Sequence, residues 1–303
     1  MVQKELFDGC ALYRLDSGEL SVCVTEYGAA VQDICYRGRH VALGYPTLEG
    51  YRQGKAFIGA IVGRVANRIG GGAVTVGGKR CELSRNERNN TLHGGVESWD
   101  RRFWQGEIRG DSLRMTLFSP DGDNGFPGSV TAAVTYSVAG SELRIDFEGE
   151  SDAETFFAPT THIYFNLKGA GSILDTEMQI DSDGWLELDE EQIPTGRVLP
   201  AEGAFDFSVP RPIAQDYDHC FVLKGERACT ARAGGIRMTL TTDYPALQFY
   251  TGIWLTEPFG KNGGFAVEPE FHPDAPNKPE FPSPLLRAGE RYHKYACFRF
   301  EEE

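Results

Sequence analysis

The chain has 303 residues, of which 41% are hydrophobic, so it can bury a large core and is not disordered. Its formal net charge of −14 disfavours binding to nucleic acid phosphates or anionic lipid, because the repulsion acts before any specific contact forms. A small neutral or cationic ligand is the more compatible partner.

The first residues, Met1–Asp8, lack the uninterrupted apolar core of a signal peptide, and no later run reaches membrane-spanning length. The seven cysteines form no C-x-x-C pair, and neutral residues such as Val22 and Val24 flank them. This pattern indicates buried thiols rather than a disulfide framework. We therefore expect a cytoplasmic protein.

Short stretches with period-two alternation recur from end to end, separated by glycine or by Pro and Asp, whereas helical periodicity is hard to find. Ala73–Val76 and Lys79–Leu83 flank Gly77-Gly78, which predicts a hairpin because paired glycines adopt the positive φ angles of a two-residue turn. Val130–Val138 and Leu143–Phe147 predict a second hairpin. Further strands are predicted at Glu177–Ile180, Cys220–Leu223, Ile236–Thr241, Leu247–Ile253 and Tyr295–Phe300.

No linker-like tract and no fixed-period repeat interrupts these strands, so we expect one domain over residues 1–303. So many strands must pair or cover their edges, as they do in packed sheets or in a barrel. The sequence predicts an all-β fold, a large antiparallel β-sandwich.

The first candidate functional residues lie in two glycine-rich segments. Arg68 precedes Gly70-Gly71-Gly72, and its guanidinium could bind vicinal hydroxyls or a carboxylate, or could simply lie at the surface before a hairpin. His93 lies in the polar segment 89–95, where the backbone can approach a ligand closely, although plain turns share this composition.

His162 lies in the segment 160–167, where alternation places it with Tyr164 and Asn166 on a hydrogen-bonding face. Taken alone, this segment favours a half-exposed strand with ordinary polar residues. A histidine beside Tyr and Asn is nevertheless suited to proton transfer.

Two later strands each carry polar side chains that could share a pocket. Alternation separates Asp218 from His219, and we favour Asp218 for the pocket. The same alternation argues against a Cys220–His219 nucleophile pair. Gln248 and Tyr250 share a face, giving a polar group and an aromatic platform on which a sugar ring can stack.

Glu268 ends an apolar strand and precedes Pro269, which favours an extended conformation. Burial without a cation would raise its pKa towards the range of a base at neutral pH. A solvent-facing strand end fits the same residues equally well.

Cofactor and metal sites are not predicted. The six histidines form no H-x-x-x-H or H-x-H pattern, and Gly70-Gly71-Gly72 is not followed by the Lys-Ser/Thr of a phosphate loop. The segment 121–125 resembles the start of a calcium loop but lacks its spacing and closing glutamate. No G-x-S-x-G motif indicates a hydrolase.

Together these segments resemble the aldose 1-epimerases, or mutarotases, in the order of their motifs over nearly the whole chain. The segments are 63–69 (GRVANRI), 90–95 (NTLHGG), 119–128, 162–167 (HIYFNL), 193–196 (IPTG), 218–219, 248–252 (QFYTG) and 273–277 (PDAPN). The resemblance implies a large antiparallel β-sandwich that interconverts the α and β anomers of free hexoses such as galactose or glucose, without a cofactor.

The resemblance also implies residue roles. Glu268 matches the general base, His162 the general acid, and His93 a second histidine that hydrogen-bonds near the ring oxygen. Residues that hold sugar hydroxyls are matched by Asn67, Arg68, Asp218 and Gln248, and Tyr250 matches the pocket wall. The chain departs from the family pattern at Thr161, where relatives usually have Asn, at Ile253, where Asn commonly follows Tyr-Thr-Gly, and at Glu270, where many relatives have Gln. Its segment 248–268 is also shorter than in longer relatives.

Two other functions remain open from the sequence. A related epimerase acting on a hexose 6-phosphate would need a cationic site, which Arg85, Arg88, Arg101 or Arg102 could supply. A non-catalytic sugar-binding sandwich would use the same pocket without chemistry, although binding alone needs no acid–base pair. The oligomeric state is not predicted.

Overall fold

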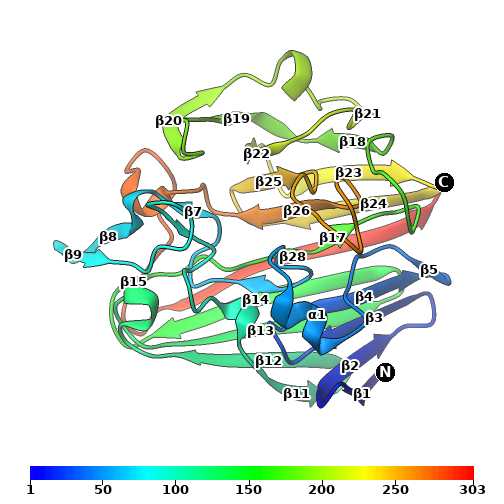
Figure 1. The fold of residues 1–303 in the computed structure, drawn as a ribbon, viewed down its shortest axis with the longest axis horizontal. Coiled ribbons are helices and arrows are strands. Elements are labelled where there is room, and N and C mark those ends of the chain that lie inside the picture. Colours follow the sequence, from blue (N-terminus) through cyan, green and yellow to red (C-terminus); the bar gives the residue numbers. More distant parts are fainter.

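The structure is a computed structural model that describes all 303 residues, Met1 to Glu303. Large antiparallel sheets dominate it, which confirms the predicted fold class (Figure 1). None of its helices has the length and apolar character needed to span a membrane.

The largest sheet has nine strands. In spatial order they are β11 (Gln105–Arg109), β12 (Ser112–Ser119), β13 (Val130–Ala139), β14 (Glu142–Ser151), β28 (Arg291–Glu302), β24 (Ile236–Thr242), β23 (Arg227–Ala233), β18 (Glu177–Ile180) and β21 (Arg211–Pro212). The C-terminal strand β28, red in Figure 1, runs through the middle of this sheet, between β14 and β24. Buried and partly exposed residues alternate along β12 and β24, because successive side chains of a strand point to opposite faces.

A six-stranded and a five-stranded sheet form the opposing layer. The six strands are β17 (Tyr164–Phe165), β26 (Phe265–Glu270), β25 (Ala246–Tyr250), β22 (Asp218–Leu223), β19 (Ser182–Leu188) and β20 (Pro194–Leu199); the five are β1 (Val2–Phe7), β2 (Cys10–Asp16), β3 (Leu20–Thr25), β4 (Val31–Tyr36) and β5 (Arg39–His40). Backbone hydrogen bonds from Leu43 to Tyr164 and from Asn166 to Val41, both 2.9 Å, join the two sheets.

The hydrophobic core lies between these layers. Phe165 of β17 packs on Phe298 of β28 with ring centroids 5.1 Å apart, and β3 contacts β13 and β14. One buried cluster contains residues from Ala11 to Phe300. Burial of this apolar surface holds the two layers together.

The remaining elements are short. They are α1 (Leu48–Gln53), the pairs β6 (Ile61–Val62) with β16 (Thr160–Thr161), β7 (Arg68–Ile69) with β10 (Thr91–Leu92), β8 (Ala73–Val76) with β9 (Lys79–Glu82) and β15 (Thr155–Phe156) with β27 (Leu285–Leu286), and the 3-10 turns η1 (Gly70–Gly72), η2 (Trp99–Arg101), η3 (Asp123–Gly125), η4 (Gly203–Phe205) and η5 (Ala275–Asn277). Of these elements, α1, β7 and β10 contribute residues to the cavity described below. Helix α1 was not predicted from the sequence. It begins after Thr47, whose side chain accepts a hydrogen bond from the Gly50 N–H.

Both predicted hairpins are confirmed. Gly77 and Gly78 have φ angles of 56° and 77°, as the turn between β8 and β9 requires. The predicted strand Leu247–Ile253 was too long: β25 ends at Tyr250, and the chain turns at Gly252, whose φ is 66°.

Candidate active site

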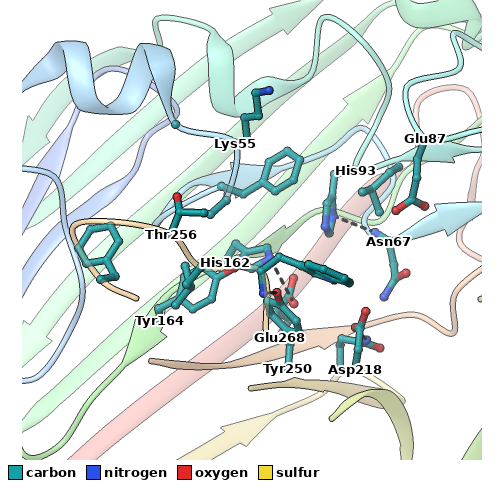
Figure 2. Close-up of a pocket in the computed structure, with 18 of the residues that line it drawn as sticks. Lys55, Asn67, Glu87, His93, His162, Tyr164, Asp218, Tyr250, Thr256 and Glu268 are labelled. Atoms are coloured by element: carbon teal, nitrogen blue, oxygen red, sulfur yellow. Dashed lines mark hydrogen bonds and ion pairs between the residues drawn. The ribbon is translucent and has the colours of Figure 1, made fainter. Parts of the chain in front are cut away.

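A cavity of about 760 Å³ lies beside α1 and the segment 251–264 that joins β25 to β26. All the site residues predicted from the sequence line it: Asn67, Arg68, His93, His162, Asp218, Gln248, Tyr250 and Glu268. Figure 2 shows His162 and Glu268 close together, with His93, Asn67, Asp218 and Tyr250 around them.

Strand register explains why residues distant in sequence meet here. Gln248 on β25 lies opposite Glu268 on β26, and Tyr250 lies opposite Asp218 on β22. Every residue of β25 and β26 is buried, because one face packs on the core and the other lines the cavity. The sequence predicted that this strand ends at Glu268, but β26 continues to Glu270.

His162 and Glu268 form a close pair at the closed end of the cavity. His162 Nε2 lies 3.6 Å from Glu268 Oε1, and their side chains are only 5% and 3% exposed. The whole segment 160–167 is buried, so the half-exposed strand considered above is wrong. The His162 ring also packs on Tyr164 and Phe57, at centroid distances of 4.8 and 5.8 Å.

Burial controls the protonation of this pair. It lowers the pKa of His162 to about 4, because the imidazolium loses its hydration. Burial also raises the pKa of Glu268 well above its usual value, and the charges of Glu270 and Asp218 raise it further, while Arg68 opposes them. Burial therefore favours the uncharged form of each group, a neutral imidazole at His162 and a protonated carboxyl group at Glu268.

His93 is held as a neutral hydrogen-bond donor. The Asn67 N–H donates to His93 Nδ1 over 3.1 Å, so the ring proton is on Nε2. Burial lowers the pKa of His93 well below its usual value, and the nearby His162 and Arg68 lower it further. Figure 2 shows His93 and Asn67 joined by this bond.

The backbone around His93 is unusual. Asn67 and His93 have φ angles of 59° and 50°, a left-handed conformation that costs energy for residues other than glycine. The next residue, Gly94, also has positive φ, and a Cβ there would lie 1.9 Å from the carbonyl oxygen of Gly63. Only glycine can occupy this position without displacing the backbone at Gly63.

Arg68 is fixed by a carboxylate that the sequence analysis did not identify. Its Nε and Nη2 donate to the two oxygens of Glu87 over 2.7 and 3.0 Å, and Nη2 lies 3.8 Å from Asp218 Oδ2. Gln248 Nε2 donates to Asp218 Oδ1 over 2.5 Å. Glu87 lies among the charged residues of a turn, and no motif distinguishes it from its neighbours.

Glu270 is a second buried carboxyl group on the same face of β26 as Glu268. Asn67 Nδ2 donates to its Oε1 over 3.0 Å, and Oε2 has no partner. Burial raises its pKa well above the usual value, whereas the bond from Asn67 lowers it. A charge on Glu270 would in turn raise the pKa of Glu268.

Other polar residues of the same segments have structural roles. His219 packs against Trp185 and Phe205, on the side of β22 away from the cavity, as alternation predicted. Asn166 Nδ2 donates to the carbonyl oxygens of Gly171 and Gly263 and does not line the cavity.

The four arginines considered for a phosphate site do not line the cavity. Arg102 pairs with Asp123, Arg85 with Glu82, and Arg88 and Arg101 donate to backbone carbonyls. They therefore give no support to a hexose 6-phosphate site.

The residues at the closed end also have the chemistry of a metal site. One ligand atom from each of His93, His162 and Glu268 lies within 4.8 Å of the others, and two imidazoles with a carboxylate are a common donor set for zinc. His93 would bind through Nε2, because Nδ1 accepts the Asn67 hydrogen bond.

Comparison with known proteins shows similarity over nearly the whole chain. Residues 11–298 match the sequence model of the aldose 1-epimerase family. The chain is 39% identical to galactose mutarotase of Homo sapiens, over 95% of this chain and 93% of the human protein, and 36% identical to aldose 1-epimerase of Escherichia coli K12, over 88% and 86%.

Solved structures are similar as well. An aldose epimerase homologue from C. elegans has a TM-score of 0.93 and 26% identity, with 97% of this chain and 99% of that chain covered. Galactose 1-epimerase from Lactobacillus acidophilus has a TM-score of 0.89 and 27% identity, with 100% and 98% covered. The likeness thus extends to both layers of the sandwich.

Proposed function

Because the chain belongs to the aldose 1-epimerase family, we propose that it interconverts the α and β anomers of free hexoses such as galactose and glucose through two residues of the cavity. Glu268 is the general base of this reaction, and His162 is the general acid. The observation that carries this proposal is the buried contact of 3.6 Å between His162 Nε2 and Glu268 Oε1. The two oxygens that must exchange protons are bonded to the same carbon of the sugar, so a base and an acid this close reach both.

Ring opening uses one proton at each oxygen. Glu268 removes the proton of the C1 hydroxyl while His162 donates a proton to the ring oxygen, the bond between C1 and the ring oxygen breaks, and the open-chain aldehyde forms. Rotation about C1–C2 presents the other face of the carbonyl, and reversal of both transfers closes the ring as the opposite anomer. Proton transfer from Glu268 to His162 produces the reactive form without changing the net charge of the pair.

The remaining lining residues hold the sugar. Asn67, Arg68, Asp218 and Gln248 bind hydroxyls, and Tyr250 forms a wall of the cavity. The bonds among Glu87, Arg68, Asp218 and Gln248 support this assignment, because they preorganise donors and acceptors before a sugar arrives. His93 donates from Nε2 near the ring oxygen, which its neutral tautomer permits.

Polarimetry or NMR of freshly dissolved α-D-galactose and α-D-glucose tests the proposal. The wild type should accelerate mutarotation, and Glu268→Gln should lower kcat by about 10²- to 10⁴-fold, the usual contribution of a positioned proton transfer. Glu82→Gln, at an exposed ion pair, is the control. Wild-type turnover in Glu268→Gln would refute the base assignment, and sugar binding without acceleration would favour a sugar-binding protein.

Two broader proposals accompany this one. The enzyme acts in the cytoplasm, supported by seven cysteines that are all free. Residues 1–303 act as one domain, supported by a core that draws on residues from Ala11 to Phe300. Thiol titration of the protein purified from cells tests the first statement and should find the cysteines reduced. Thermal unfolding tests the second and should show a single cooperative transition.

A further inference from the structure

Phe57 has a backbone conformation that its side chain does not favour. It lies in the turn before β6 and has a φ of 54°. Among the non-glycine residues with positive φ, it is the only one with a large apolar side chain. A bulky side chain in the left-handed region costs free energy, which the surrounding structure must offset. Such conformations concentrate at functional sites, where they aim a side chain.

The ring of Phe57 packs on both histidines of the cavity. Its centroid lies 4.7 Å from that of His93, in an edge-on arrangement, and 5.8 Å from that of His162, with an angle of 26° between the two ring planes. Phe57 is half-buried and lines the cavity. The ring is therefore part of the cavity wall at the point where the two histidines lie.

No hydrogen bond within the protein fixes the plane of the His162 ring. Its Nδ1 is buried without a partner in the protein, and its Nε2 lies 3.6 Å from Glu268 Oε1, which is longer than a hydrogen bond. Rotation of an imidazole about χ2 has only a broad intrinsic preference. The orientation of this ring therefore depends on the side chains that pack against it.

The backbone of His162 is held against the turn that carries Phe57. The Gly59 N–H donates to the carbonyl oxygen of His162 over 2.9 Å, and the His162 N–H donates to the carbonyl oxygen of Ala60 over 2.8 Å. The Ala60 N–H donates to the carbonyl oxygen of Phe57 over 3.0 Å and closes the turn. These bonds fix the position of the His162 backbone but leave its ring free to rotate.

Two flat side chains lie nearly parallel to the His162 ring. Tyr164 lies 4.8 Å away at an angle of 31°, and Phe57 is the other. His93 does not depend on such packing for its own orientation, because the Asn67 N–H donates to its Nδ1 over 3.1 Å. Loss of the Phe57 ring should therefore disturb His162 and leave the tautomer of His93 in place.

Resting on the proposed function, we propose that Phe57 is a positioning residue for the general acid. Its ring fixes the plane of the His162 imidazole, so that the proton on Nε2 points at the ring oxygen of the sugar when the bond to C1 breaks. Phe57 itself exchanges no proton. The strain of its backbone is retained because the left-handed conformation places the ring against His162.

Steady-state mutarotation of α-D-galactose by variants of Phe57 tests this inference. Phe57→Ala should lower kcat by about 10- to 100-fold and leave KM nearly unchanged, because a small misplacement of a catalytic group can cost that much. Phe57→Tyr keeps an aromatic ring on the same backbone and should retain most of the wild-type kcat. A ring that only packed the fold would change neither constant in protein that stays folded.

Phe57→Gly removes the ring and the strain together. Glycine adopts positive φ readily, so this variant should unfold at a higher urea concentration than Phe57→Ala, although its kcat should be equally low. A Phe57→Gly variant no more stable than Phe57→Ala would overturn the claim that the backbone of Phe57 is strained.

Phe103→Ala is the matched control. Phe103 also packs edge-on against an aromatic ring, that of Tyr27 at a centroid distance of 5.2 Å, but it does not line the cavity. The control should leave kcat unchanged.

Wild-type kcat in Phe57→Ala, or an equal loss of kcat in Phe57→Tyr and Phe57→Ala, overturns the positioning role alone. A rise in KM with unchanged kcat also overturns it, because the ring would then bind the sugar and would not orient His162. Failure of the wild type to accelerate the mutarotation of galactose and glucose overturns the proposed function.

Discussion

Glu268 and Glu270 lie two residues apart on one face of β26, and their spacing should control the pH range of activity. In the proposed mechanism, His162 and Glu268 together hold one proton when they react. Below about pH 4, the lowered pKa of His162, the pair gains a second proton and Glu268 can no longer accept one. Above the raised pKa of Glu268 the pair loses its only proton, so none is left to donate. We predict a bell-shaped pH profile of kcat/KM.

Glu270→Gln should move the alkaline limb of that profile to lower pH. The substitution keeps the shape of the side chain and removes the negative charge that raises the pKa of Glu268. Glu226→Gln, an exposed acid outside the cavity, is the control. An alkaline limb at the same pH in Glu270→Gln and the wild type would show that Glu270 does not influence the base.

Metal ions should inhibit and should not activate. The proposed reaction needs only proton transfers, so dialysis against EDTA should leave kcat unchanged. Zn²⁺ should inhibit competitively with galactose, because His93, His162 and Glu268 would bind it where the sugar reacts. Loss of activity with EDTA and its recovery with zinc would contradict the proposed mechanism.

The turn that carries Glu87 positions Arg68 from outside the sheet. Glu87→Gln weakens a two-point ion pair whose arginine is only 12% exposed, so the guanidinium loses its fixed orientation. We expect KM for galactose to rise by about tenfold with little change in kcat, since one charge-assisted bond contributes roughly 1.5–3 kcal/mol. Steady-state kinetics with Glu82→Gln as control measures this, and an equal effect in both variants would refute it.

The loop after β10 depends on a glycine for its close approach to the backbone at Gly63, just after β6. Gly94→Ala should destabilise the fold by more than Gly110→Ala, although both glycines have positive φ. Alanine at 110 meets no atom within 4 Å and has only the backbone strain of about 1–3 kcal/mol, whereas at 94 it also collides with Gly63. Urea unfolding of both variants compares these costs, and equal losses would show that the collision is relieved.

The sequence predicted which segments form strands better than it predicted the residues at which those strands end. The hairpin at Gly77-Gly78 carries its own turn chemistry, so it could be predicted. The end of β25 at Tyr250 and the continuation of β26 through Pro269 depend on pairing partners far along the chain, which no local pattern contains. The helix α1 has too few turns for a periodic signal.

For the whole molecule, the C-terminal strand should matter more than the N-terminal one. β28 lies inside the nine-stranded sheet, and its removal would expose the inner edges of β14 and β24. β1 is an edge strand that pairs with β2 alone and is mostly exposed. Deletion of residues 290–303 should abolish cooperative unfolding measured by circular dichroism, whereas deletion of residues 1–8 should lower Tm by only a few degrees. The opposite ranking would contradict this view of the core.

Alternation and ordered motifs in the sequence were enough to predict the all-β class, eight of the residues that line the cavity, and the family. Alternation alone separated Asp218 from His219, because it depends only on neighbouring residues. The burial that favours the uncharged forms of His162 and Glu268, and the support of Arg68 by Glu87, are visible only in the folded structure. These properties depend on burial and on distances between segments far apart in the chain, and such contacts exist only after the two layers have packed.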